Sequence, residues 1–103
     1  MFVLLVASSD SMNTIRDIVG LSNSLSMKGH KVIIFYNDES VNLLESGREE
    51  LTGLPVGVRL KVCRTTASKK GLNKREDFII GVEMSSLGEL VELMEEAERT
   101  VFL

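Results

Sequence analysis

Two runs of consecutive apolar residues most restrict how this chain can fold. Phe2 to Ala7 and Val32 to Tyr36 are apolar at every position and rich in residues that favour strands. A strand with one face in solvent alternates apolar and polar residues, whereas these runs place apolar side chains on both faces. They therefore predict two strands of a parallel sheet that is covered on both sides.

A helix is predicted between these two strands. Its apolar residues recur at helical spacing, at Ile15, Ile18, Val19 and Leu25. We expect Asn13 or Thr14 to cap its start, with Asp17 in the first turn, where the helix dipole stabilises a carboxylate.

The middle of the chain contains a third strand. Val58, Leu60 and Val62 alternate with Arg59 and Lys61, which predicts a strand with one face near solvent, ending at Cys63. A short helix over Glu39 to Leu44 and a mobile surface loop over Ser46 to Gly57 are expected before it, and a short helix over Thr65 to Lys70 after it.

The last third of the chain is predicted to add two strands and a helix. A fourth strand lies within Phe78 to Met84, and Arg99 to Leu103 forms a fifth. Between them, Ser86 and Glu89 fit a capping box. The apolar stripe of the helix that follows is Leu87, Leu90, Val91, Met94 and Ala97. The alternation of strands and helices along the chain predicts one domain over residues 1–103. Its expected fold class is α/β, with three layers (α/β/α) and a five-stranded, mainly parallel sheet, flavodoxin- or Rossmann-like.

Composition excludes several functional classes. The chain has one Cys and one His among 103 residues, too few for a disulfide scaffold or a zinc finger, so no metal is expected. Its formal net charge of −3 argues against direct nucleic-acid binding. The first apolar run is too short to span a membrane and lacks the flanks of a signal peptide. The free thiol and the lack of an export signal predict a cytoplasmic protein that does not bind membranes.

Polar residues follow the first four predicted strands, at the sheet edge where α/β proteins bind ligands. The expected rim of a site is Ser8, Ser9, Asp10, Asn37 and Asp38, together with Ser85 and Ser86. Cys63 stands between a strand and a helix start, where backbone N–H groups favour a thiolate.

Cations surround this cysteine in the sequence. Residues 59–75 contain seven of the 12 basic residues and none of the 15 acidic ones, whereas residues 76–103 contain eight acids and one base. A positive field lowers the pKa of a thiol and attracts anions. We expect Cys63 to be a nucleophile, the backbone of Thr65 and Thr66 to stabilise a sulfur anion, and Arg64, Lys69 and Lys70 to supply charge and a docking surface. Two simpler interpretations stay open: a buried, inert cysteine and a solvated basic face.

Three motifs resemble the DsrE/DsrF/TusD sulfur-relay family. Residues 58–72 are similar to the family's strand, cysteine, short helix and basic-basic-Gly-Leu turn. Residues 27–35 are similar to its Gly-His-x-Val segment, at the entry to the second strand. Residues 88–103 are similar to its last helix and strand. Asn37 to Ser40 lacks the Gly-containing turn often seen there, and the loop at Ser46 to Gly57 is shorter than in some subunits.

The resemblance implies a small α/β/α domain that assembles into homotrimers or hexamers. It also implies that Cys63 is the cysteine that carries a persulfide between sulfur donor and acceptor proteins, with no cofactor. The alternative is a non-catalytic oligomeric binding or assembly module with an inert Cys63. A third hypothesis is flavodoxin-like binding of a small phosphorylated ligand at Ser8 to Thr14, a polar turn at a helix start.

Overall fold

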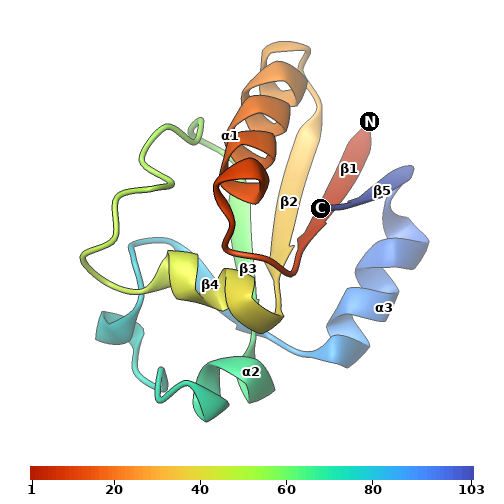
Figure 1. Ribbon diagram of the computed structural model, residues 1–103. Helices are drawn as coiled ribbons and strands as arrows, with labels where there is room; N and C mark the ends of the chain where they lie inside the picture. The colour runs from red at the N-terminus through yellow and green to blue at the C-terminus, as the bar shows by residue number, and fades with distance from the viewer.

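Five parallel strands form the central sheet (Figure 1). A computed structural model describes all residues, 1–103. The strands are β1 (Phe2–Ala7), β2 (Lys31–Tyr36), β3 (Arg59–Cys63), β4 (Val82–Ser85) and β5 (Arg99–Phe102). Their order across the sheet is β4-β3-β2-β1-β5, and every neighbouring pair is parallel. The predicted α/β/α fold class is confirmed.

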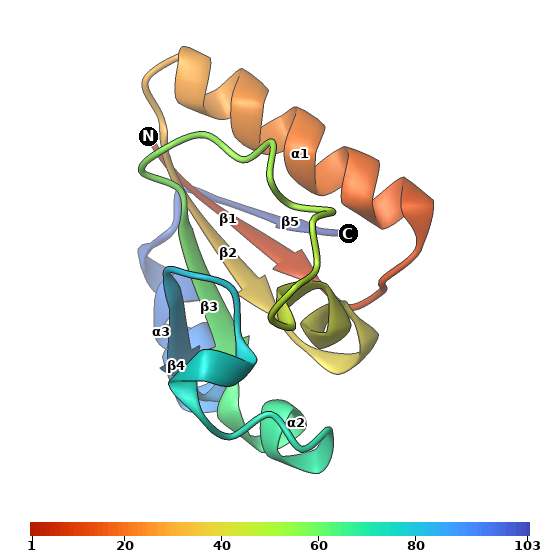
Figure 2. The same ribbon diagram turned by 90° about the vertical axis from the view of Figure 1, so that its left-hand side faces the viewer.

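Helical segments cover both faces of the sheet. They are α1 (Met12–Met27), the 3₁₀ helix η1 (Asp38–Leu44), α2 (Arg64–Lys69), the 3₁₀ helix η2 (Arg75–Asp77) and α3 (Leu87–Glu96). The chain steps from β1 to β4 in one direction, with α1 on one face, and then returns past β1 to β5 by way of α3 on the other face (Figure 2). Right-handed crossovers require this change of face when the direction reverses. None of these helices combines the length and the apolar character needed to cross a membrane.

The core is divided between the two faces of the sheet. The larger cluster lies on the α1 face and joins buried residues of β1, β2 and β3 to Ile18 of α1, Val41 of η1 and Ala67 of α2. The smaller cluster lies on the α3 face and consists of Leu4, Val6, Ile33, Phe35, Cys63 and Leu93. The central strands β1 and β2 are buried on both faces, as their continuous apolar runs predict.

The loop over residues 46–57 has no regular strand or helix but is anchored to the core. Leu51 is buried in the larger cluster, and Leu54 packs against it. Turns occupy the rest of the segment, with Gly47 and Gly57 at positive φ. The loop therefore helps to cover the α1 face, which the apolar pattern of the sequence does not show.

The start of α1 differs from the prediction. The helix begins at Met12, and Ser11 is its cap: the Ser11 hydroxyl accepts a hydrogen bond of 3.2 Å from the Thr14 backbone N–H. Asn13 and Thr14 therefore lie inside the first turn, and Asp17 lies beyond it. Thr14 is buried and its hydroxyl contacts that of Ser11, so it lies in the first helical turn as a partner of the cap and is not the cap itself.

The apolar stripe of α3 also differs from the prediction. Leu93 is buried against the sheet and Leu90 and Ala97 pack beside it, so these residues form the inward face. Leu87, Val91 and Met94 point away from the sheet and are 54%, 55% and 39% exposed. The helix thus has two apolar faces, and helical spacing alone does not show which of them meets the core.

Ser86 determines where α3 begins, and its loss is predicted to destabilise the fold. Its hydroxyl accepts a hydrogen bond of 3.1 Å from the Glu89 backbone N–H. We expect Ser86→Ala to lower the free energy of unfolding by about 1 kcal/mol, the usual contribution of a capping hydroxyl. Urea denaturation measures this change. The exposed Ser24→Ala in mid-α1 is the control and should change stability by less than about 0.5 kcal/mol; an equal change in both variants would contradict the capping role.

Candidate functional site

Short polar contacts tie together the carboxyl ends of the strands. The Thr66 hydroxyl donates to the Asn37 side-chain oxygen over 2.6 Å, which links α2 to the end of β2. Asn42 of η1 donates to Asp10 over 3.1 Å, beyond the end of β1. The structure therefore brings these predicted rim residues to one edge of the sheet.

The remaining rim residues have local structural roles. The backbone carbonyl of Ser8 accepts a hydrogen bond from Ser40, and the Ser9 hydroxyl accepts one from the Ser11 N–H. Asp38 opens η1 with a φ of 50°, the only positive φ outside glycine. This left-handed conformation is uncommon outside glycine, although Asp adopts it more readily than most residues. The turn from Ser8 to Thr14 is thus held both by its own hydroxyl groups and by hydrogen bonds from Ser40 and Asn42 of η1.

Cys63 is the last residue of β3 and is deeply buried. It is paired in register with Ser85, the last residue of β4, so both side chains project from the same face of the sheet. This is the α3 face, and Cys63 is 2% exposed within the smaller apolar cluster. The chain leaves β3 for α2 and the α1 face but leaves β4 for α3, so the two residues flank a change of face, where open α/β sheets place their ligands.

The short helix α2 does not hold the thiol. Cys63 is its capping residue, yet the side chain makes no capping hydrogen bond, so the thiol is not bound by the N–H groups of the helix start near Thr65 and Thr66. Ala67 anchors α2 to the larger cluster on the α1 face, whereas the thiol belongs to the cluster on the other face. Arg64 and Lys69 are exposed.

A buried lysine near Cys63 is the residue that sequence reasoning missed. Lys61 was expected near solvent, but its side chain is only 8% exposed. Its Nζ lies 2.7 Å from Glu89 Oε1 of α3 and 3.7 Å from Glu83 Oε2. The Ser85 hydroxyl donates to the same Glu89 oxygen over 2.6 Å. The prediction is wrong because α3 covers this part of β3, and the Glu89 side chain bonds Lys61 and Ser85.

These contacts favour the charged forms of two carboxyl groups. The hydrogen bond from Lys61, and then that from Ser85, holds the pKa of Glu89 below its ordinary value. The pKa of Glu83 is lowered chiefly by Arg59, which donates two hydrogen bonds of 3.0 Å to it. The groups beside Cys63 therefore form a network of paired charges.

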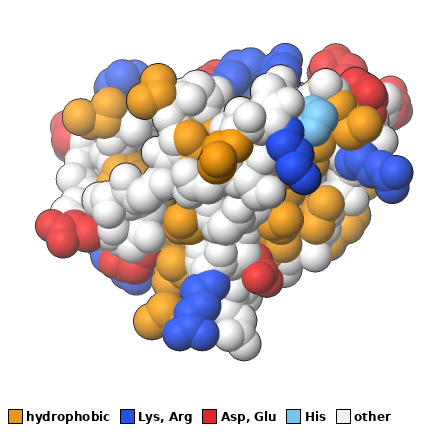
Figure 3. All heavy atoms as spheres, turned by 90° about the horizontal axis from the view of Figure 1, so that it is seen from above, with side chains coloured by type: hydrophobic (Ala, Val, Ile, Leu, Met, Phe, Trp, Pro, Cys, Tyr) orange, Lys and Arg blue, Asp and Glu red, His pale blue; other side chains and the backbone are white.

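Ion pairs neutralise part of the basic stretch. Arg59 and Lys61 pair with glutamates of β4 and α3, and Lys70 lies 3.3 Å from Glu39 of η1. The other four cations of the stretch form no ion pair; they are Arg64, Lys69, Lys74 and Arg75. The excess positive charge thus lies on α2 and η2, on the outer side of this edge. At the opposite, amino-terminal end of the sheet, side chains of both charges are mixed with apolar ones (Figure 3).

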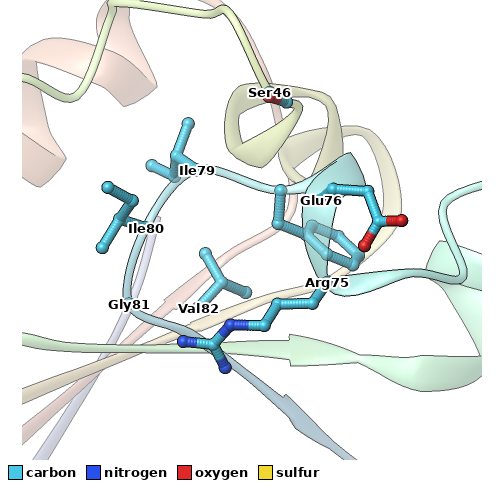
Figure 4. A pocket seen from close by; sticks show the side chains of 8 residues that line it. Ser46, Arg75, Glu76, Ile79, Ile80, Gly81 and Val82 are labelled. Carbon is cyan, nitrogen blue, oxygen red and sulfur yellow. The ribbon is translucent and has the colours of Figure 1, made fainter.

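The surface hollows of the molecule do not include Cys63. The first, of about 390 Å³, lies beside the start of β4 between Ser46, Arg75 and the segment from Phe78 to Val82 (Figure 4). Two further hollows share Phe78 with it. No three His, Cys, Asp or Glu side chains lie close enough to hold a metal ion together. The candidate site is therefore a closed edge around Cys63, with no open pocket.

Comparison with known proteins identifies the family of this chain. The sequence model of the DsrE/DsrF-like family matches residues 1–103.

The chain belongs to the DsrE/DsrF-like family.

Solved structures show the same fold at low identity to this DsrE/DsrF-like chain. They include a protein of unknown function, MTH1491, from Methanobacterium thermoautotrophicum (21% identity, TM-score 0.83, covering 99% of this chain and 98% of that one). The YchN protein of E. coli has 20% identity and a TM-score of 0.78, with 99% and 97% covered. Protein BT1422 of unknown function from Bacteroides thetaiotaomicron has 17% identity and a TM-score of 0.80, with 99% and 94% covered. No curated protein matches the chain.

The lowered pKa of Glu89 predicts a pH-dependent contribution to stability. The ionised carboxylate stabilises the fold above the ordinary glutamate pKa of about 4.5, and this contribution is lost as the pH falls through the lower pKa of the folded state. The difference in free energy of unfolding between wild type and Glu89→Gln should therefore be largest near neutral pH and shrink below pH 4.5. Urea titrations across this range measure it. Glu92→Gln, on the exposed side of α3, serves as control; a difference that stays constant with pH for Glu89→Gln would refute the prediction.

Proposed function

We propose that this chain is a sulfur-relay protein that carries sulfur as a persulfide on Cys63. The observation that carries the proposal is the position of its one thiol, at the end of β3 beside the point where the chain changes face, in a member of the DsrE/DsrF-like family. No other side chain at this edge is an equally strong nucleophile, because thiolates react more readily than hydroxyls. The lone thiol also suits a reducing compartment, so we place the relay in the cytoplasm.

The proposed reaction transfers one sulfur atom without net oxidation or reduction. The Cys63 thiolate attacks the outer sulfur of a donor persulfide, R–S–SH, and the donor leaves as the thiolate R–S⁻. Cys63 then holds the group –S–SH. The thiolate of an acceptor protein attacks the outer sulfur in turn, the S–S bond to Cys63 breaks, and the Cys63 thiolate is restored.

Transfer requires the thiol to become accessible. At 2% exposure, Cys63 is out of reach of a partner's sulfur in the closed structure. Parts of a native protein open locally without global unfolding, especially where few apolar contacts hold them. The smaller cluster on the α3 face includes only one buried residue of α3, Leu93, so this helix would lose few apolar contacts on opening.

The free cations on α2 suit the docking of a partner. Arg64 and Lys69 are exposed and have no acidic partner within the chain. They project from the segment that directly follows Cys63. An exposed cationic surface attracts acidic surfaces and speeds their association. We propose that this surface docks the acidic faces of the donor and acceptor proteins.

The burial of Cys63 favours a second candidate, a non-catalytic assembly module. Buried thiols in apolar surroundings are inert. In this candidate Cys63 is only a packing residue, and the function lies in the surfaces of the oligomer. Slow alkylation of Cys63 in the native protein, together with the absence of any persulfide, would favour this module over the relay.

The outer face of α3 supports assembly in either case. Leu87, Val91 and Met94 recur every three or four residues and are exposed, so they form an apolar stripe. Acidic residues lie to one side of this outer stripe, with Glu95 next to it and Glu92 and Glu96 further round the helix. A second copy of α3 packed directly against it would bring like charges together, which is unfavourable.

A different surface of a second copy fits the outer stripe better. The free cations at η2, Lys74 and Arg75, complement its acidic side, and Arg64 and Lys69 of α2 stay open to the donor and acceptor. Contact between two different surfaces of identical chains is head-to-tail, and it closes into a ring when the rotation allows. We therefore propose a cyclic homo-oligomer in which the outer stripe meets Lys74 and Arg75 of the next copy. The family resemblance implies that the ring is a trimer, alone or as a pair of trimers.

The sulfur-relay proposal predicts a specific adduct. After incubation with a small persulfide donor, intact-protein mass spectrometry should show one added sulfur atom on the wild type, mapped to Cys63. Cys63→Ser should gain none. Addition of a thiol acceptor should remove the adduct from Cys63 and transfer its outer sulfur to that acceptor. If Cys63 gains no sulfur natively but does so after denaturation in urea, the thiol is intact but inert, and the relay is wrong.

The assembly proposal predicts a change in mass on substitution of the outer stripe. Val91→Lys places a positive charge in the apolar contact and repels Lys74 and Arg75 of the neighbouring copy. It should therefore shift the protein toward the 11.4 kDa monomer in light scattering at micromolar concentration. Val56→Lys replaces a fully exposed valine in the loop and should leave the mass unchanged. A wild type that is already monomeric contradicts the assembly.

A further inference from the structure

We infer that Lys61, Ser85 and Glu89 form a latch that holds the first turn of α3 closed over Cys63 and sets how often the thiol meets solvent. This inference rests on the proposed role of Cys63 and adds its control. The latch is defined by two contacts to one carboxylate oxygen, 2.7 Å from Lys61 Nζ and 2.6 Å from Ser85 Oγ. It joins two neighbouring strands to the helix that covers them.

The latch lies beside the thiol. Lys61 is two residues before Cys63 on β3, so both side chains project from the same face of the sheet. Ser85 is the register partner of Cys63 on β4. Glu89 lies in the first turn of α3, whose start Ser86 caps. The three residues of the latch thus lie around the same end of the β3–β4 pair as the thiol.

Of the elements around Cys63, α3 can move at the least cost. The strands β2 and β4 are joined to β3 by backbone hydrogen-bond ladders, so they cannot separate without breaking the sheet. The first turn of α3 is held by the Ser86 cap, by apolar packing of Leu90 and by the latch. Opening at this turn leaves the sheet intact.

The strength of the latch suits a gate that opens reversibly. The Lys61 side chain is 8% exposed and its ammonium donates its short hydrogen bond to Glu89, whereas the Glu89 side chain is 40% exposed. Separation of the pair costs a charged hydrogen bond, and water that reaches both groups offsets part of that cost. Glu83, 3.7 Å from Lys61, keeps the ammonium partly paired while α3 is open. No buried charge is therefore left without a partner.

Opening also releases a cation on the face that carries the thiol. Once Glu89 withdraws, the Lys61 ammonium keeps only its 3.7 Å contact with Glu83, so it can also pair with an incoming anion, such as the ionised form of a donor persulfide. An opposite charge nearby favours the ionised form of such a group. Lys61 is therefore a positioning residue that exchanges an internal carboxylate for the sulfur anion of the partner.

The alkylation rate of Cys63 in the folded protein tests the latch. The probe is iodoacetamide in excess, followed by mass spectrometry, with Cys63→Ser as the blank. We expect Lys61→Met and Glu89→Gln to react about tenfold faster than wild type, because a charged hydrogen bond no longer resists opening. Lys61→Met keeps the length of the side chain and leaves no unpaired ammonium. Glu92→Gln, an exposed charge on the same helix, is the matched control and should react at the wild-type rate.

Hydrogen exchange separates local opening from loss of the whole fold. In both latch variants, faster exchange should be confined to the first turn of α3, while β1 and β2 keep their protection. Unchanged alkylation in both variants would overturn the latch, and so would faster exchange throughout the sheet. Failure of the sulfur relay is distinguishable, because rapid alkylation without any sulfur adduct on Cys63 supports the latch and refutes the relay.

Discussion

The handedness of parallel crossovers is the constraint on which this structure depends. Four strands added in one direction place every connection on one face of the sheet, and only a reversal of direction brings the chain to the other face. The reversal occurs once, between β4 and β5, and it leaves α3 as the only helix on its face. The burial of the thiol, the pairing of the lysine and the exposure of the outer stripe all follow from this single helix.

The fold could be predicted because its strongest signals are local. The runs in β1 and β2 are apolar at every position and cannot be placed in solvent on either side, so they indicate a doubly covered sheet without knowledge of the rest. The alternating run before Cys63 gives β3, and Ser86 marks the start of α3. The chain order of these elements then leaves few possible topologies, although the strand order itself could not be read from the sequence.

The environment of the candidate site depends on contacts between distant residues, which the sequence does not show. Arg59 and Lys61 occupy equivalent positions in an alternating strand, but the Lys61 side chain is buried against Glu89 of α3, whereas Arg59 pairs with Glu83 of β4 and stays exposed. The same helix buries Cys63. The sequence of α3 has apolar residues on two sides of the helix, so helical spacing could not show whether Leu93 or Val91 faces the sheet. The cationic stretch was visible in the sequence, but the pairing that neutralises three of its members was not.

The pairing of β1 with β5 has a consequence for how the chain reaches this state. The strand β1 is the first element of the chain and lies inside the sheet, and one of its two neighbours, β5, is the last element, with Val3 opposite Arg99. Closing a loop of nearly the whole chain costs entropy before any contact compensates it, and sheets with such distant pairings form slowly. Until β5 arrives, one edge of β1 and the apolar side chains beneath α3 are open to other chains. A mutation that slows this last step would therefore favour aggregation even where the finished fold is as stable as before.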